Sequence, residues 1–120
     1  WEKHPEPIYP STVQIWKFLV EKYSWDAILD IGANYGELAA LAFLHRQSIS
    51  SPIYVFEPAL TLREPLHLTF GDKEQVFLEF VGLSDRDGHA TFRTAAPHAR
   101  SFRTPMRVPC RKIRYRDARD

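Results

Sequence analysis

Two glycines and an asparagine separate apolar segments in the sequence AILDIGANYGELAALAF, residues 27 to 43. Gly32 and Gly36 remove side chains where a ligand would have to approach the backbone. The following segment has helical apolar spacing, so its first N–H groups would be free at the turn. Asp30 adds a carboxylate just before the turn, which suits a ligand carrying an ammonium or hydroxyl groups better than one carrying phosphates. The turn is therefore predicted to bind a nucleotide-like cofactor.

Two further groups are expected at the same place. Glu57 closes the apolar segment YVFEP, at roughly the interval where an acid accepts hydrogen bonds from ribose hydroxyls in dinucleotide sites. GLSD at 82 to 85 ends the next apolar segment, where the main chain of Leu83 and Ser84 and the carboxylate of Asp85 could contact an adenine ring. Taken alone, Glu57 would be better explained as a solvated loop acid. Together with the turn, these groups are expected to face one crevice.

The elements that must position these residues alternate along the chain. The order predicts an α/β fold of the Rossmann-like type, with a mostly parallel sheet, helices on both of its faces and a β-hairpin excursion at the C-terminal end. Residues 1–10 contain three prolines and are expected to form an extended lead-in. Helices are predicted at about 12–23, from about 36 to before 48, and at 59–70; strands at 26–31, 52–58 and 75–83; a turn at Asp87 and Gly88 before 89–93; a loop at 94–106; and a last strand from 106.

The motifs LDIGANYGELAALA, YVFEP and FVGLSDRDGHATF, in this order and spacing, resemble the FkbM-type family of class I S-adenosylmethionine-dependent methyltransferases. The resemblance extends from about Thr12 to about Ile113. It implies S-adenosylmethionine as cofactor and methyl transfer to a hydroxyl oxygen, on substrates that include polyketides and sugars. It also implies that the turn lines the methionine part of the cofactor, that Glu57 holds the ribose, and that GLSD lies near the adenine. The residues predicted to bind the cofactor are Asp30, Gly32, Ala33, Asn34, Tyr35, Gly36, Glu57, Pro58, Leu83, Ser84 and Asp85.

The family pattern is not matched to its end. In the family, the β excursion leads into a strand with a K-I-D-V-E-G-like segment that helps to form the active site, and RKIRYRDARD at 111–120 does not match it. We therefore expect residues 1–120 to be a single, truncated cofactor-binding domain with an incomplete sheet and little or no turnover. No catalytic base is assigned, and the acceptor and the oligomeric state stay open.

Two other functions fit parts of the pattern. An NAD(P)-dependent Rossmann oxidoreductase shares the strand, the glycine turn, the helix and the second acid. The turn G-A-N-Y-G lacks, however, the G-x-G-x-x-G glycine that lets a pyrophosphate sit on the helix. The third possibility is a non-catalytic binding domain in which the acids are vestigial.

The composition argues against several classes of partner. The formal net charge is +1, and the nine Lys and Arg residues after position 92 are better explained as a solvated strand face than as a nucleic-acid site. Cys110 and the five His residues show no metal-ligand spacing, so no metal is predicted. No apolar run is long enough to cross a bilayer, and a cytoplasmic location is the default expectation. The expected partner is a small-molecule or glycan acceptor.

Overall fold

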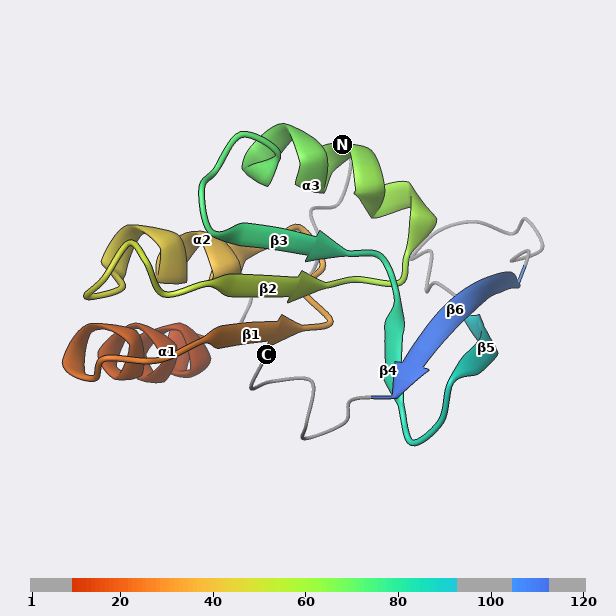
Figure 1. Ribbon diagram of the computed structural model, residues 1–120, viewed down its shortest axis with the longest axis horizontal. Helices are drawn as coiled ribbons and strands as arrows, with labels where there is room; N and C mark the ends of the chain where they lie inside the picture. The colour runs from red at the N-terminus through yellow and green to blue at the C-terminus, as the bar shows by residue number, and fades with distance from the viewer. Residues whose placement is uncertain (1–9, 93–104, 113–120) are drawn as a thin grey trace.

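The computed structural model describes residues 10–92 and 105–112, and helices and strands alternate through most of this part of the chain (Figure 1). A mixed α/β arrangement with a mostly parallel sheet and flanking helices is confirmed. The predicted helices and the first two strands lie within a few residues of their expected positions. The elements are α1 (Pro10–Lys22), β1 (Ile28–Ile31), α2 (Glu37–His45), β2 (Ile53–Phe56), η1 (Leu60–Leu62), α3 (Arg63–Phe70), β3 (Val76–Glu79), β4 (Gly82–Ser84), β5 (Gly88–Phe92) and β6 (Met106–Lys112).

Strands β1, β2 and β3 form a parallel sheet in that order, with Ile28 opposite Ile53 and Ile53 opposite Val76. Buried positions alternate with more exposed ones along β1 and β2, and the buried Ile28, Ile53 and Val55 share one core with residues of all three helices. Each large apolar side chain buried there contributes about 1.5–3 kcal/mol. The buried core consists of Val20, Ile28, Ala33, Ala39, Ala42, Ile53, Val55, Leu66 and Phe70.

The opposite face of this sheet is not covered by any helix of the described chain. Leu29 and Ile31 of β1 are 42% and 59% exposed, and Phe77 of β3 is 44% exposed. The rings of Tyr54 and Phe77 stack on this face with centroids 5.3 Å apart. The prediction that the sheet is covered on both faces is therefore wrong for the described residues, because α1, α2 and α3 all pack on the face that carries Ile28.

The helical layer follows the order of the strands. Helix α3 packs on β3, α2 lies over β1 and β2, and α1 packs against α2. Gly36, which precedes α2, faces Phe70 of α3. The indole N–H of Trp16 in α1 donates to the Leu38 carbonyl of α2 at 2.9 Å. Helix α1 is therefore the outermost helix at the β1 side of the sheet, where Figure 1 also places it.

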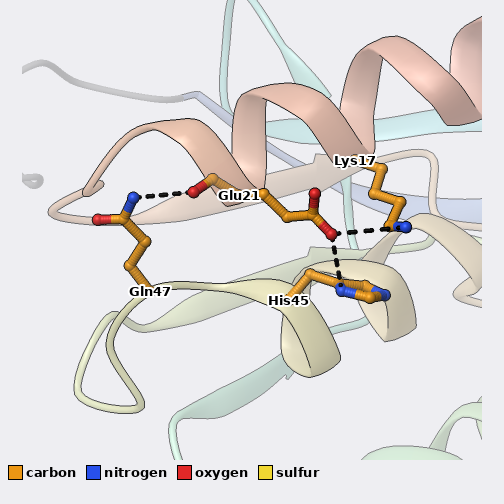
Figure 2. Close-up of polar contacts among 4 residues, drawn as sticks. All are labelled: Lys17, Glu21, His45 and Gln47. Carbon is orange, nitrogen blue, oxygen red and sulfur yellow. Dashed lines mark hydrogen bonds and ion pairs between the residues drawn. The ribbon is translucent and has the colours of Figure 1, made fainter.

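Polar contacts join the C-terminal ends of α1 and α2 (Figure 2). The Glu21 carboxylate lies 3.0 Å from Nδ1 of His45 and 3.5 Å from Nζ of Lys17. The Gln47 side chain donates to the Glu21 carbonyl at 2.8 Å. One flank of α1 is thus polar and faces α2.

The β excursion is present as a second sheet with the order β4-β6-β5. Its antiparallel pair is β5 with β6, and β4 pairs parallel with β6. The turn at Asp87 and Gly88 therefore does not join two paired strands, because β6 lies between β4 and β5. The predicted strand 75–83 is likewise divided: β3 ends at Glu79, and Gly82 already belongs to the second sheet.

One correction concerns the start of the first helix. Pro10 is the first residue of α1 rather than the last of an extended lead-in, and proline is favoured at a first helical position because it needs no N–H partner there. Residues 1–9 and most of the predicted loop 94–106 lie outside the described residues.

In the described ranges, no helix combines the length and apolarity needed to cross a membrane.

Candidate functional site

The glycine turn between β1 and α2 is built from three residues with positive φ. These are Gly32 at 76°, Asn34 at 55° and Gly36 at 84°. The N–H groups of Gly32 and Ala33 both donate to the Phe56 carbonyl, at 2.9 and 3.0 Å, so the turn is attached to the end of β2. The sequence therefore folds into a tight left-handed turn at the carboxyl end of the sheet, as predicted from its glycines.

The two glycines are required for different reasons. A Cβ on Gly36 would lie 2.4 Å from Cε2 of Phe70 and 3.1 Å from Cδ2 of Leu66, so this glycine allows α3 to pack against the start of α2. A Cβ on Gly32 would meet nothing within 4 Å. The space beside Gly32 is open, which is the condition for a ligand to approach the main chain there.

Asp30 is buried at the end of β1 and contacts helix α2. Its Oδ2 accepts the backbone N–H of Ala39 at 3.0 Å, so it satisfies one of the free N–H groups in the first turn of the helix. Burial raises the pKa of the Asp30 carboxyl, the Ala39 hydrogen bond partly offsets this, and the charges of Glu37 and Glu57 raise it further. Asp30 therefore holds the helix in position as well as placing a carboxylate at the turn.

The raised pKa of Asp30 predicts a pH-dependent stability. A carboxyl whose folded pKa lies above its ordinary value of 3.8 stabilises the fold when protonated, and this contribution falls as pH rises through the folded pKa. The amide in Asp30→Asn cannot ionise, so we expect this variant to gain free energy of unfolding relative to the wild type as pH rises from about 4. Urea denaturation at a series of pH values measures the difference.

Asp72 provides the control for this experiment. Its carboxylate accepts a hydrogen bond from Lys73 at 3.1 Å, and this bond and the lysine charge lower its pKa. The free energy of unfolding of Asp72→Asn should therefore fall relative to that of the wild type as pH rises. The prediction would be contradicted if the free energy of unfolding of Asp30→Asn, relative to that of the wild type, stayed constant or fell as pH rises.

Glu57 is the second buried acid, and it joins the glycine turn to the loop after β2. Its Oε2 accepts the backbone N–H of Asn34 at 2.8 Å, and its Oε1 accepts the N–H of Ala59 at 2.9 Å. The side chain is not a solvated loop acid, since Glu57 is only 5% exposed. A carboxylate oxygen has two lone pairs, so each oxygen can accept one more hydrogen bond.

Acidic groups gather around this turn. Asp30 and Glu57 are both buried, and Glu37 is the first residue of α2. The charges of Glu37 and Glu57 both act on Asp30. The turn is therefore electronegative although it lies at a helix N-terminus. Nowhere in residues 10–92 and 105–112 do three His, Cys, Asp or Glu residues form a group that could hold a metal ion.

The remaining predicted residues lie around or beyond the turn. Tyr35 is 46% exposed, and Ala33 is buried in the core. Pro58 follows Glu57 and faces the start of β4, since a Cβ on Gly82 would lie 3.9 Å from Cβ of Pro58.

Ser84 and Asp85 are exposed at the end of β4. The Ser84 hydroxyl donates to Asp85 Oδ1 at 3.1 Å, and Arg86 lies 3.7 Å from the same oxygen. Leu83 is half-buried in β4. The structure thus brings Asp30, Asn34 and Glu57 together, and it places Leu83, Ser84 and Asp85 in the second sheet and its following turn.

Two contributors to this site were not predicted. Glu37 adds a third acid, and its position directly after Gly36 in the sequence was the available signal. The backbone N–H of Ala59 orients Glu57, and no sequence signal identifies such a main-chain contact.

The comparison with solved structures agrees with this fold. No protein-family model matches the sequence, and no curated protein matches it significantly. Among solved structures, the chain is similar to the crystal structure of a SAM-dependent O-methyltransferase from Thermotoga maritima, with a TM-score of 0.51 and 17% sequence identity. The match covers 66% of this chain and 31% of that one, so the chain spans about a third of that structure's length. The fold is Rossmann-like, with the arrangement seen in that methyltransferase.

Proposed function

We propose that this chain is the cofactor-binding part of a longer S-adenosylmethionine-dependent methyltransferase. The proposed reaction is methyl transfer to a hydroxyl oxygen of a small molecule, a sugar or a lipid-like acceptor, as in the FkbM-type family that the sequence motifs resemble. Structural likeness to the O-methyltransferase from Thermotoga maritima supports the class. The location of the glycine turn at the carboxyl ends of parallel strands supports the position of the site.

The observation that carries the proposal is the group of acidic residues at the glycine turn. A dinucleotide would bring its pyrophosphate to this helix N-terminus, beside the carboxylates of Asp30 and Glu37, and like charges would repel it. S-adenosylmethionine instead carries an ammonium group and a sulfonium, both of which are favoured near carboxylates. The electrostatics of the turn therefore favour this cofactor over NAD.

The residues present can hold such a ligand. The open space at Gly32 admits the methionine part against the main chain. Oδ1 of Asp30 can accept from the ammonium while Oδ2 retains the Ala39 N–H. The remaining lone pairs of Glu57 can accept from the two ribose hydroxyls. We place the exposed ring of Tyr35 over the ligand, and Leu83, Ser84 and Asp85 toward the adenine.

Once bound, S-adenosylmethionine supplies a methyl group on a positively charged sulfur. The contribution of the chain is to bind and orient it, and orientation of the reacting atoms accounts for a large share of the rate in such transfers. Deprotonation of the acceptor hydroxyl requires a base. We assign no residue of this chain to that role.

A comparison of two ligands tests the proposal. We expect S-adenosylhomocysteine to raise the melting temperature of the chain and NAD to leave it unchanged. A ligand at 100 times its Kd stabilises the folded state by about 2.7 kcal/mol. Stabilisation by NAD alone would support the oxidoreductase, and no shift with either ligand would support a non-catalytic domain.

Two alanine variants localise the binding. Gly32→Ala fills the open space at the turn, and Gly88→Ala introduces the same kind of change at a second glycine with positive φ and open surroundings, in β5. Both substitutions strain the backbone, because both glycines have a positive φ, so the two variants should have similar free energies of unfolding without ligand. We expect only Gly32→Ala to weaken S-adenosylhomocysteine binding, by about tenfold or more, which corresponds to about 1.4 kcal/mol. Isothermal titration calorimetry measures both affinities.

A further inference from the structure

Helix α3 contacts the end of the glycine turn through two buried side chains. A Cβ on Gly36 would meet Cε2 of Phe70 and would lie 3.0 Å from Cζ of the same ring and 3.1 Å from Cδ2 of Leu66. Phe70 and Leu66 are 2% and 0% exposed, so neither side chain can move aside into solvent. The Phe70 ring therefore packs directly against the main chain at Gly36.

Gly36 is the residue at which the turn becomes a helix. It precedes α2, and its φ of 84° lies in the left-handed region. Its N–H donates to the Ala33 carbonyl at 2.8 Å, and its own carbonyl accepts the N–H of Ala40 at 2.8 Å. A shift of Gly36 would therefore move the turn on one side and the first turn of α2 on the other.

The two buried acids of the site are held by main-chain groups on either side of Gly36. Glu57 accepts the N–H of Asn34, which precedes Gly36, and Asp30 accepts the N–H of Ala39, which follows it. A displacement of Gly36 would therefore change how both carboxylates lie relative to the turn.

The segment that ends in α3 is also attached to Glu57. Oε1 of Glu57 accepts the N–H of Ala59 at 2.9 Å, and the Ala59 carbonyl accepts the N–H of Leu62 at 3.1 Å, in the short helix η1 that leads into α3. This segment thus holds Glu57 at one end, and its Phe70 ring supports Gly36. Residues 59–70 therefore help to set the position of the proposed ribose ligand relative to the glycine turn.

We propose that Phe70 is a positioning residue for the cofactor, because its ring supports Gly36 and thereby holds the glycine turn in the geometry that binds the ligand. The identity of that ligand rests on the proposed function. Groups that bind a ligand must be held to within about 0.5 Å by packed neighbours. A smaller side chain at position 70 would leave space beside Gly36, into which the turn can move.

Isothermal titration calorimetry with S-adenosylhomocysteine tests the role of the ring. Phe70→Leu removes ring atoms beside Gly36, and we expect the Kd to rise about tenfold or more. Phe70→Met should restore part of the affinity, because the long and flexible methionine side chain can fill more of the space.

Ile53→Val is the matched control for a small cavity in the core. Ile53 is fully buried, but it is the first residue of β2 and so lies at the opposite end of the sheet from the turn. We expect this variant to bind S-adenosylhomocysteine with the wild-type Kd. A wild-type Kd in Phe70→Leu would overturn the proposal. An equal rise in Ile53→Val would also overturn it, since a general loss of packing would then explain the effect.

Amide hydrogen exchange without ligand tests the same support independently of the cofactor. Phe70→Leu should speed the exchange of the Gly36 and Ala40 amides about tenfold. Exchange at Arg46, whose N–H donates to the Ala42 carbonyl at the other end of α2, should not change. Unchanged exchange at Gly36 and Ala40 would overturn the proposal. If the wild-type chain does not bind S-adenosylhomocysteine but exchange changes as expected, the proposed function fails and the support of the turn by Phe70 stands.

Discussion

Replacing Gly36 by alanine is expected to lower the free energy of unfolding by about 2–5 kcal/mol. Two costs add at this position. A non-glycine residue at a φ of 84° is strained, by about 1–2 kcal/mol, and the new Cβ would lie 2.4 Å from the Phe70 ring. Overpacking of this kind typically costs about 1–3 kcal/mol. Urea denaturation followed by circular dichroism measures the loss.

A double-mutant cycle separates the two costs. Phe70→Leu removes ring atoms that the new Cβ would meet, so the Gly36→Ala substitution should cost less in that background by the packing contribution alone. Gly32→Ala is the matched control, because Gly32 has the same kind of φ and open surroundings. We expect it to lose only about 1–2 kcal/mol. Equal losses at Gly32 and Gly36 would show that α3 does not pack against the start of α2.

Removing the carboxylate of Glu57 is expected to affect both stability and binding. Glu57→Ala leaves the N–H groups of Asn34 and Ala59 without their acceptor, and each unsatisfied buried group costs about 1–3 kcal/mol. Water can reach the exposed Asn34, so we expect a total loss of about 2–4 kcal/mol. Because Glu57 is also the proposed ribose ligand, S-adenosylhomocysteine affinity should fall at least about tenfold.

Two further variants make this result specific. Glu57→Gln keeps one carbonyl oxygen as acceptor, so its loss of stability should lie between those of the wild type and Glu57→Ala. Glu74→Ala removes an exposed acid and should stay within about 0.5 kcal/mol of the wild type. Wild-type stability in Glu57→Ala would contradict the role of this carboxylate in holding the turn.

The sequence predicted best the elements that are determined by residues close to one another in the chain. Apolar spacing located α1 and α2, and α3 (Arg63–Phe70) lies within the helix predicted at 59–70. The division between β3 and β4 was missed because residues 75–83 form one apolar run, and only the partner strand decides which sheet each half joins. The exposed face was missed because Leu29 and Ile31 are apolar whether or not a helix covers them.

The glycine turn was predictable from its residue types, but its hydrogen-bond partners were not. The positive φ values at Gly32 and Gly36 follow from their being glycines in a strand-to-helix turn. The partners of the two acids could not be predicted, because main-chain N–H groups such as those of Ala39 and Ala59 have no sequence signature. The sequence therefore located Asp30 and Glu57 correctly at strand ends without revealing that both also hold the backbone in place.

The position of β6 between β4 and β5 has a consequence for how the chain folds. Strand β6 supplies the pairing for both neighbours, so neither β4 nor β5 can complete its ladder before residues 106–112 are available. The sheet of β1, β2 and β3 depends only on earlier residues and pairs strands that follow one another in sequence. During synthesis, which proceeds from the N-terminus, β1, β2 and β3 are therefore available to pair before β4 and β5 are, because the second sheet closes only when β6 emerges.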